Sequence, residues 1–77
     1  MVLEPKELSI RGDMILLQSM LKLVGAIGNG GEVKSFLAEE GVRVDGVVET
    51  RRGRKLYNGA VVEVPGGEAY RIVAEAP

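Results

Sequence analysis

Four cationic side chains crowd into one short segment and are the strongest chemical signal in the sequence. Arg51, Arg52, Arg54 and Lys55 surround Gly53, and no apolar period runs through them that would bury them. A guanidinium fork fits a phosphate group, an ammonium supplies a compact charge, and a glycine lets the backbone approach a ligand closely. The segment therefore favours an anionic partner, most simply nucleic acid, although a solvated run of surface charge has the same composition.

This positive charge stands against an acidic background. Residues 42–56 contain five Lys or Arg and two Asp or Glu, a local net charge of +3, whereas the whole chain carries −1. A cluster of this kind creates its own field over a Debye length of about 8–10 Å. We therefore expect a local binding patch rather than a general affinity for nucleic acid.

Enzyme chemistry has few residues to use here. The 77 residues contain no His and no Cys, which removes the commonest general base, the commonest metal ligand and the thiolate nucleophile. The serines then have no histidine that could activate them. We expect a non-enzymatic protein that needs no metal or cofactor and takes no small-molecule substrate.

Weaker candidates for a phosphate contact lie upstream. Lys22 is isolated on an apolar helix, where the pattern alone favours a snorkelling side chain. Asn29, Gly30 and Gly31 precede a predicted helix whose free N–H groups could hold a phosphate oxygen, although a plain glycine-rich helix stop is the default interpretation. Lys34 lies on a different side of that second helix from its apolar stripe.

Aromatic side chains are scarce in this sequence. Phe36 fits the apolar stripe of the second helix, and Tyr57 adjoins the cationic segment, so Tyr57 is the candidate for stacking on a base. With only Tyr70 besides these two, the chain has too few rings for a base-stacking platform. Many phosphate-binding groups and few rings favour recognition of a structured duplex by its shape.

The elements that must position these residues are short. Asp45-Gly46 between alternating valines predicts a hairpin with a type I′ turn, in which Val42, Val44 and Val47 share one face. Asp13 is a plausible N-cap for the first helix. Periodicity predicts strands over 6–10, 60–64 and 69–74, and helices over 14–24 and 32–40. This order predicts an α+β fold in which two helices pack on one face of a small curved sheet.

The helices should pack through one apolar stripe each. The predicted contact residues are Leu17, Leu21, Val24, Val33, Phe36 and Leu37. If Phe36 is in the core, its truncation to alanine should cost about 3–5 kcal/mol. The cations of the 51–55 segment should instead contribute little to stability, because exposed charges seldom do.

The length predicts a single domain over residues 1–77, with 1–5 as a loose arm. No apolar run reaches the roughly 18–20 residues that span a bilayer, and the first residues, MVLEPKEL, do not form a secretory signal. We therefore expect a soluble cytoplasmic protein without a membrane partner.

Three sequence motifs in this order resemble a known family. LLQSMLKL, the glycine turn before EVKSFL, and VDGVVETRRGRKL followed by NGAVVEV resemble the S-four type RNA-binding domain, also called the alpha-L domain. Within that family the chain looks most like the free-standing bacterial YaaA/YbcJ-like proteins. The resemblance implies an alpha-L fold, with two helices on a small curved antiparallel sheet. It also implies binding to structured ribosomal RNA, in ribosome assembly or translation.

The resemblance also implies a set of RNA-binding residues. Carried over position by position, these are Lys22, Asn29, Gly30, Gly31, Lys34, Arg43, Arg51, Arg52, Arg54 and Lys55. Many members of the family carry an arginine at the start of the second helix, where this chain has Gly31-Glu32, so Lys34 is the substitute that we expect. The alternative function is a protein-interaction module whose cationic segment docks an acidic partner protein.

Overall fold

Seven short strands and two helices follow one another along the described residues. The computed structural model describes residues 4–28, 33–66 and 68–75. The elements are β1 (Lys6–Ile10), β2 (Met14–Leu16), α1 (Leu17–Leu23), α2 (Val33–Glu40), β3 (Val42–Val44), β4 (Val47–Glu49), β5 (Lys55–Tyr57), β6 (Val61–Glu63) and β7 (Ala69–Ala74). Neither helix in this part of the chain has the length and apolar character needed to cross a membrane.

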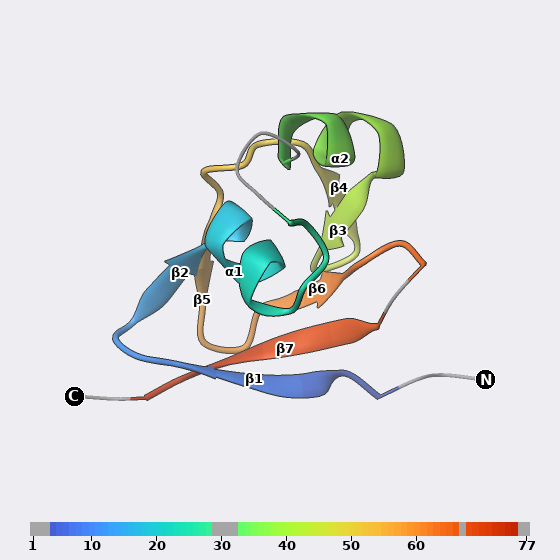
Figure 1. The fold of residues 1–77 in the computed structure, drawn as a ribbon. Helices are drawn as coiled ribbons and strands as arrows, with labels where there is room; N and C mark the ends of the chain where they lie inside the picture. The colour runs from blue at the N-terminus through green and yellow to red at the C-terminus, as the bar shows by residue number, and fades with distance from the viewer. Residues whose placement is uncertain (1–3, 29–32, 67, 76–77) are drawn as a thin grey trace.

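Five of the described strands form one sheet, the large sheet, in the order β1-β7-β6-β3-β4 (Figure 1). β1 runs parallel to β7, with Leu8 opposite Ile72, whereas the other neighbouring strands are antiparallel. The α+β class is confirmed, but the expected small antiparallel sheet is wrong both in size and in the direction of this pair. Alternating short strands do not specify their neighbours, and a parallel neighbour is reached only through a long crossover.

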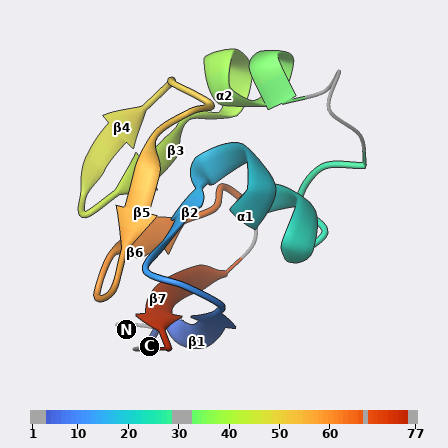
Figure 2. The same ribbon diagram turned by 90° about the vertical axis from the view of Figure 1, so that its left-hand side faces the viewer.

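Both helices lie on the same side of the large sheet, which curves around them (Figure 2). The predicted helix contacts that are almost fully buried are Leu17, Leu21, Val33 and Leu37. Val24 and Phe36 are only partly buried against this core, because both border an open groove of about 290 Å³ beside the turn between β6 and β7. The prediction that Phe36 is a core residue is therefore wrong in degree.

The first helix begins three residues later than its apolar pattern predicts. Residues 14–16 form β2, which pairs antiparallel with β5. Leu16 then occupies the N-cap position, without a side-chain hydrogen bond, so the assignment of Asp13 as N-cap is wrong. The apolar run over 14–16 fits a helix stripe and a strand equally well, and pairing with the distant β5 decides between them.

The predicted hairpin is present between β3 and β4. Asp45 and Gly46 both have positive φ, 52° and 84°, as a type I′ turn requires. The register places Val44 opposite Val47, on the face predicted for both. β4 is an edge strand, and Val47 is therefore 69% exposed even though Val44 is buried.

Candidate nucleic-acid interface

The cationic segment forms a loop between β4 and β5 that is tied to the start of α1. We call residues 50–54 the basic loop. The backbone N–H of Leu17 donates to the carbonyl oxygen of Arg54 at 2.8 Å, and the N–H of Gln18 donates to that of Arg52 at 3.0 Å. The first N–H groups of a helix have no partner within the helix. Here the basic loop supplies that partner, and the helix start fixes the path of the loop.

One buried carboxylate holds two arginines of the loop. Glu49, at the end of β4, is 7% exposed and lies opposite Val42, on the buried face of the hairpin. Its Oε2 accepts from Nε of Arg51 at 3.2 Å, and its Oε1 accepts from Nη2 of Arg51 at 3.1 Å. The same Oε1 accepts from Nη1 of Arg54 at 2.8 Å. We call this arrangement the Glu49 clasp.

The clasp also includes the backbone of the loop. The N–H groups of Thr50 and Arg51 each donate to Oε2 of Glu49 at 3.1 Å. A carboxylate that accepts several hydrogen bonds strongly prefers its charged form. Glu49 therefore holds both the first turn of the loop and two of its guanidinium groups.

The electrostatic state of the clasp follows from these hydrogen bonds. The pKa of Glu49 falls from 4.5 to about 2, mainly because the side chain of Arg51 and, to a smaller extent, that of Arg54 donate hydrogen bonds to it. Burial acts in the opposite direction. The contact with Glu49 raises the pKa of Arg51 above its ordinary value. Glu49 and Arg51 are therefore both charged at neutral pH. An arginine has five N–H donors, so the contacts with Glu49 leave donors for a ligand.

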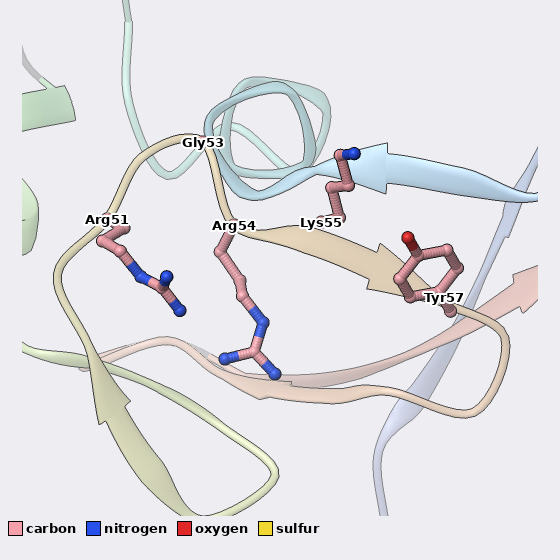
Figure 3. Close-up of a pocket in the computed structure, with 5 residues that line it drawn as sticks. All are labelled: Arg51, Gly53, Arg54, Lys55 and Tyr57. Carbon is pink, nitrogen blue, oxygen red and sulfur yellow. The ribbon is translucent and has the colours of Figure 1, made fainter.

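An open hollow lies beside the basic loop. Its volume is about 550 Å³, and it is lined by Arg51, Gly53, Arg54, Lys55 and Tyr57 (Figure 3). Figure 3 shows the side chains of Arg51 and Arg54 extending from the loop in one direction, while those of Lys55 and Tyr57 project from β5 in the opposite direction. Three cationic residues and one aromatic residue therefore line the hollow, but only Lys55 and Tyr57 share a direction.

The exposed face of β5 contributes to two hollows. Lys55 and Tyr57 are exposed on either side of the buried Leu56 along the strand. Together with Arg54 they also line a second hollow, of about 290 Å³, that extends to the β3–β4 turn at Asp45. The cationic surface therefore continues from the basic loop along β5.

The other predicted site residues are not gathered at this hollow. Arg52 is exposed in the basic loop but does not line the hollow. Arg43 is exposed on the outward face of the large sheet, opposite Glu63 of β6. Lys22 is exposed in the last turn of α1. These three cations do not line the recess.

Four of the predicted positions cannot be placed at side-chain level. Asn29, Gly30 and Gly31 lie outside the described residues, and the predicted phosphate site at this turn stays a prediction. Lys34 belongs to α2, and its side chain also lies outside the described part of the structure.

Glu49 is the residue that the sequence reasoning missed. No acidic residue lies among or directly after the cations, since residues 50–58 contain no Asp or Glu. The signal was present in the hairpin register, which places Glu49 on the same face as Val42. A carboxylate on a buried face needs cationic partners, and arginines follow two and five positions later. These contacts lead us to expect that Arg51 and Arg54, unlike a free loop cation, contribute to stability.

Comparison with known proteins identifies the class to which this fold and this surface belong. Residues 8–73 match the S4 domain family, and the chain belongs to that family. It is 46% identical over 66 residues to the Bacillus subtilis (strain 168) protein named "Probable ribosome maturation protein RlbA", covering 86% of this chain and 93% of that protein. It is 40% identical over 58 residues to the Escherichia coli (strain K12) protein named "Putative RNA-binding protein YbcJ", covering 75% and 81%. Both relatives therefore consist of little besides this domain.

Proposed function

We propose that this protein binds structured RNA through the phosphates that meet the basic loop and β5. The observation that carries the proposal is the hollow lined by Arg51, Arg54 and Lys55, in which two guanidinium groups are already held by Glu49. Phosphate contacts of this kind position an RNA without reading its sequence. Membership of the S4 domain family supports RNA as the partner.

Preorganisation is what the Glu49 clasp contributes to this function. An unattached arginine loses side-chain entropy when it is fixed on a phosphate. Two arginines that already share a carboxylate lose less, and their remaining donors point from a fixed loop backbone. The carboxylate also offsets one positive charge, which reduces the purely electrostatic attraction. The function that we propose therefore depends on the geometry of the cations as well as on their number.

The RNA that we propose is ribosomal. The support is the name of the Bacillus subtilis relative, "Probable ribosome maturation protein RlbA", and that of the Escherichia coli relative, "Putative RNA-binding protein YbcJ". In this proposal the protein acts in the cytoplasm, in ribosome assembly or translation, by binding alone and without a catalytic step.

The test is ultraviolet crosslinking in cells, followed by sequencing of the bound RNA against a total-RNA input. We expect discrete enriched sites in ribosomal RNA. The matched variant changes Arg52 and Lys55 to Gln, which removes two exposed cations but leaves the Glu49 clasp intact. In cells that carry this variant, the enriched crosslinking sites should disappear. Absence of enriched RNA sites, with an acidic protein crosslinked instead, would favour the protein-interaction module.

A further inference from the structure

Gly53 is the third residue of a turn over residues 51–54, which the N–H of Arg54 closes by donating to the carbonyl oxygen of Arg51 at 3.2 Å. Gly46 and Gly59 have φ values of +84° and +91°, which side chains rarely adopt. Gly53 is not in that region of φ, and a Cβ built on it meets nothing within 4 Å. Neither backbone strain nor crowding in the free protein therefore excludes an alanine here. Gly53 lines the 550 Å³ hollow, where the absence of a side chain lets a ligand approach the backbone closely.

Tyr57 on the same hollow is exposed to an extent that is unusual for an aromatic side chain. Its exposure is 55%, and the exposed Lys55 lies two residues before it on β5. An aromatic face beside cationic groups offers a stacking surface for a base and charges for the adjoining phosphate. The volume of about 550 Å³ lies within the roughly 300–1,000 Å³ of pockets that enclose small molecules.

We propose that this hollow receives one unpaired nucleotide of the bound RNA. Its base stacks on Tyr57, its phosphate meets Lys55, and its backbone passes close to Gly53. This inference rests on the proposed function and narrows it. The substrate class is an RNA duplex with a bulged or junction nucleotide, rather than a continuous duplex.

The selectivity follows from the cost of exposing a base. A base within a continuous duplex must be unstacked and unpaired before it can reach Tyr57, whereas a bulged base is already free. In both RNAs, the backbone phosphates remain available to the other cations of the basic loop. A free nucleoside monophosphate has the same chemistry, a base joined to a phosphate, so the test must separate these two sources.

The experiment measures the affinity of the whole chain for three labelled RNA hairpins by fluorescence anisotropy. The first hairpin is fully paired, the second carries one bulged adenosine, and the third carries an abasic residue at the bulge. Base–aromatic stacking corresponds to roughly 5- to 150-fold in affinity, and we expect a preference in this range for the bulged over the paired hairpin. The protein should show no such preference for the abasic hairpin over the paired one. Adenosine monophosphate added as a competitor should remove the preference only at concentrations far above that of the hairpin.

Three variants assign the preference to the hollow. Tyr57→Leu should abolish the preference for the bulged hairpin, and Tyr57→Phe, which keeps a ring, should retain it. Gly53→Ala should weaken the bulged hairpin more than the paired one. Its fold should be unaffected, because the added methyl group meets nothing in the free protein. Thermal melting of each variant checks the fold.

The outcomes separate the two proposals. Equal affinity for paired and bulged hairpins would overturn the nucleotide site and leave RNA binding intact. A preference that survives in Tyr57→Leu and in Gly53→Ala would place the nucleotide elsewhere and overturn the assignment to this hollow. If adenosine monophosphate alone binds with the same dissociation constant as the bulged hairpin, the hollow takes a free nucleotide, and RNA is not its source. Failure to bind any of the hairpins would overturn the proposed function itself.

Discussion

The backbone N–H of Leu17 donates a hydrogen bond to the carbonyl oxygen of Arg54 across 2.8 Å. This contact joins the buried first residue of α1 to the basic loop, 37 positions further along the chain. Gln18 and Arg52 make the same kind of contact one residue further into the helix. The helix that anchors the core and the loop that presents the cations are therefore one structural unit. Because these are backbone contacts, side-chain substitutions in the loop leave them available.

The first prediction concerns which loop arginine stabilises the fold. Arg54 donates to the buried Glu49 at 2.8 Å, whereas Arg52 is exposed. Arg54→Ala should lower the free energy of unfolding by about 1–2 kcal/mol, because it removes a charged hydrogen bond from a buried acceptor. Arg52→Ala should stay within about 0.5 kcal/mol of the wild type. Urea denaturation of both variants measures the difference, and equal effects would mean that the Glu49 clasp does not stabilise the fold.

The second prediction is a pH dependence of stability caused by Glu49. Its pKa in the folded protein is about 2, below the ordinary 4.5, so its contribution is complete above about pH 5 and is lost as the pH falls toward 2. The size of the contribution is about 1–2 kcal/mol, less than the full shift of the pKa would give, because water around Arg51 screens the pair.

Thermal melting from pH 6 to pH 2 measures this effect against Glu49→Gln, which keeps the shape and cannot ionise. The variant should melt lower at pH 6 and should lose less stability on acidification. Glu39→Gln, which removes an exposed carboxylate on α2, is the matched control and should follow the wild type. If Glu49→Gln loses as much stability as the wild type on acidification, Glu49 is not the group responsible.

The third prediction concerns the sign of the effect of Glu49 on RNA affinity. Removing a carboxylate beside a polyanion should strengthen binding if only charge matters. We predict instead that Glu49→Gln binds RNA roughly fivefold more weakly, about 1 kcal/mol, because Arg51 and Arg54 are no longer held for phosphate. Glu39→Gln makes the same change of net charge at a distance and should not weaken binding. Tighter binding by Glu49→Gln would show that the carboxylate only neutralises the loop.

The fourth prediction orders two core substitutions in α2. Leu37 is 1% exposed, and Leu37→Ala should cost about 2–5 kcal/mol. Phe36 is only partly buried, at the edge of an open groove. Phe36→Ala should therefore cost less than the about 3–5 kcal/mol typical of a fully buried phenylalanine. Denaturant melts that find Phe36→Ala the more damaging of the two would place Phe36 inside the core.

Local signals in the sequence predicted the parts of the fold that depend on neighbouring residues. The type I′ turn at Asp45-Gly46 follows from φ preferences alone, and most of the helix stripes follow from period. The parts that depend on distant partners were not predictable in this way. The strand at 14–16 depends on its pairing with β5. The strand at 6–10 follows from its period, but its parallel direction depends on its pairing with β7.

The candidate site likewise has a part that the sequence predicts and a part that depends on tertiary structure. Residue type and clustering were enough to locate the basic loop, because exposed cations around a glycine need no tertiary partner to be recognised. The role of Glu49 depends on a cross-strand register and on a loop that folds back over it. The common hollow of Arg54 and Tyr57 likewise follows from the path of the chain, which the helix start at Leu17 fixes.

The measurement that tests the central claim most directly is the salt dependence of affinity for a structured RNA. The wild type should lose affinity as salt rises, with a log–log slope of about −0.7 to −0.9 for each phosphate contact. The double variant Arg52→Gln/Lys55→Gln, which leaves the Glu49 clasp intact, should flatten the slope by about 1.4–1.8. Arg11→Gln/Arg71→Gln, with the same change of net charge on exposed residues outside the basic loop, should leave the slope unchanged. An unchanged slope in the first variant, or equal flattening in both, would contradict an RNA site on the basic loop.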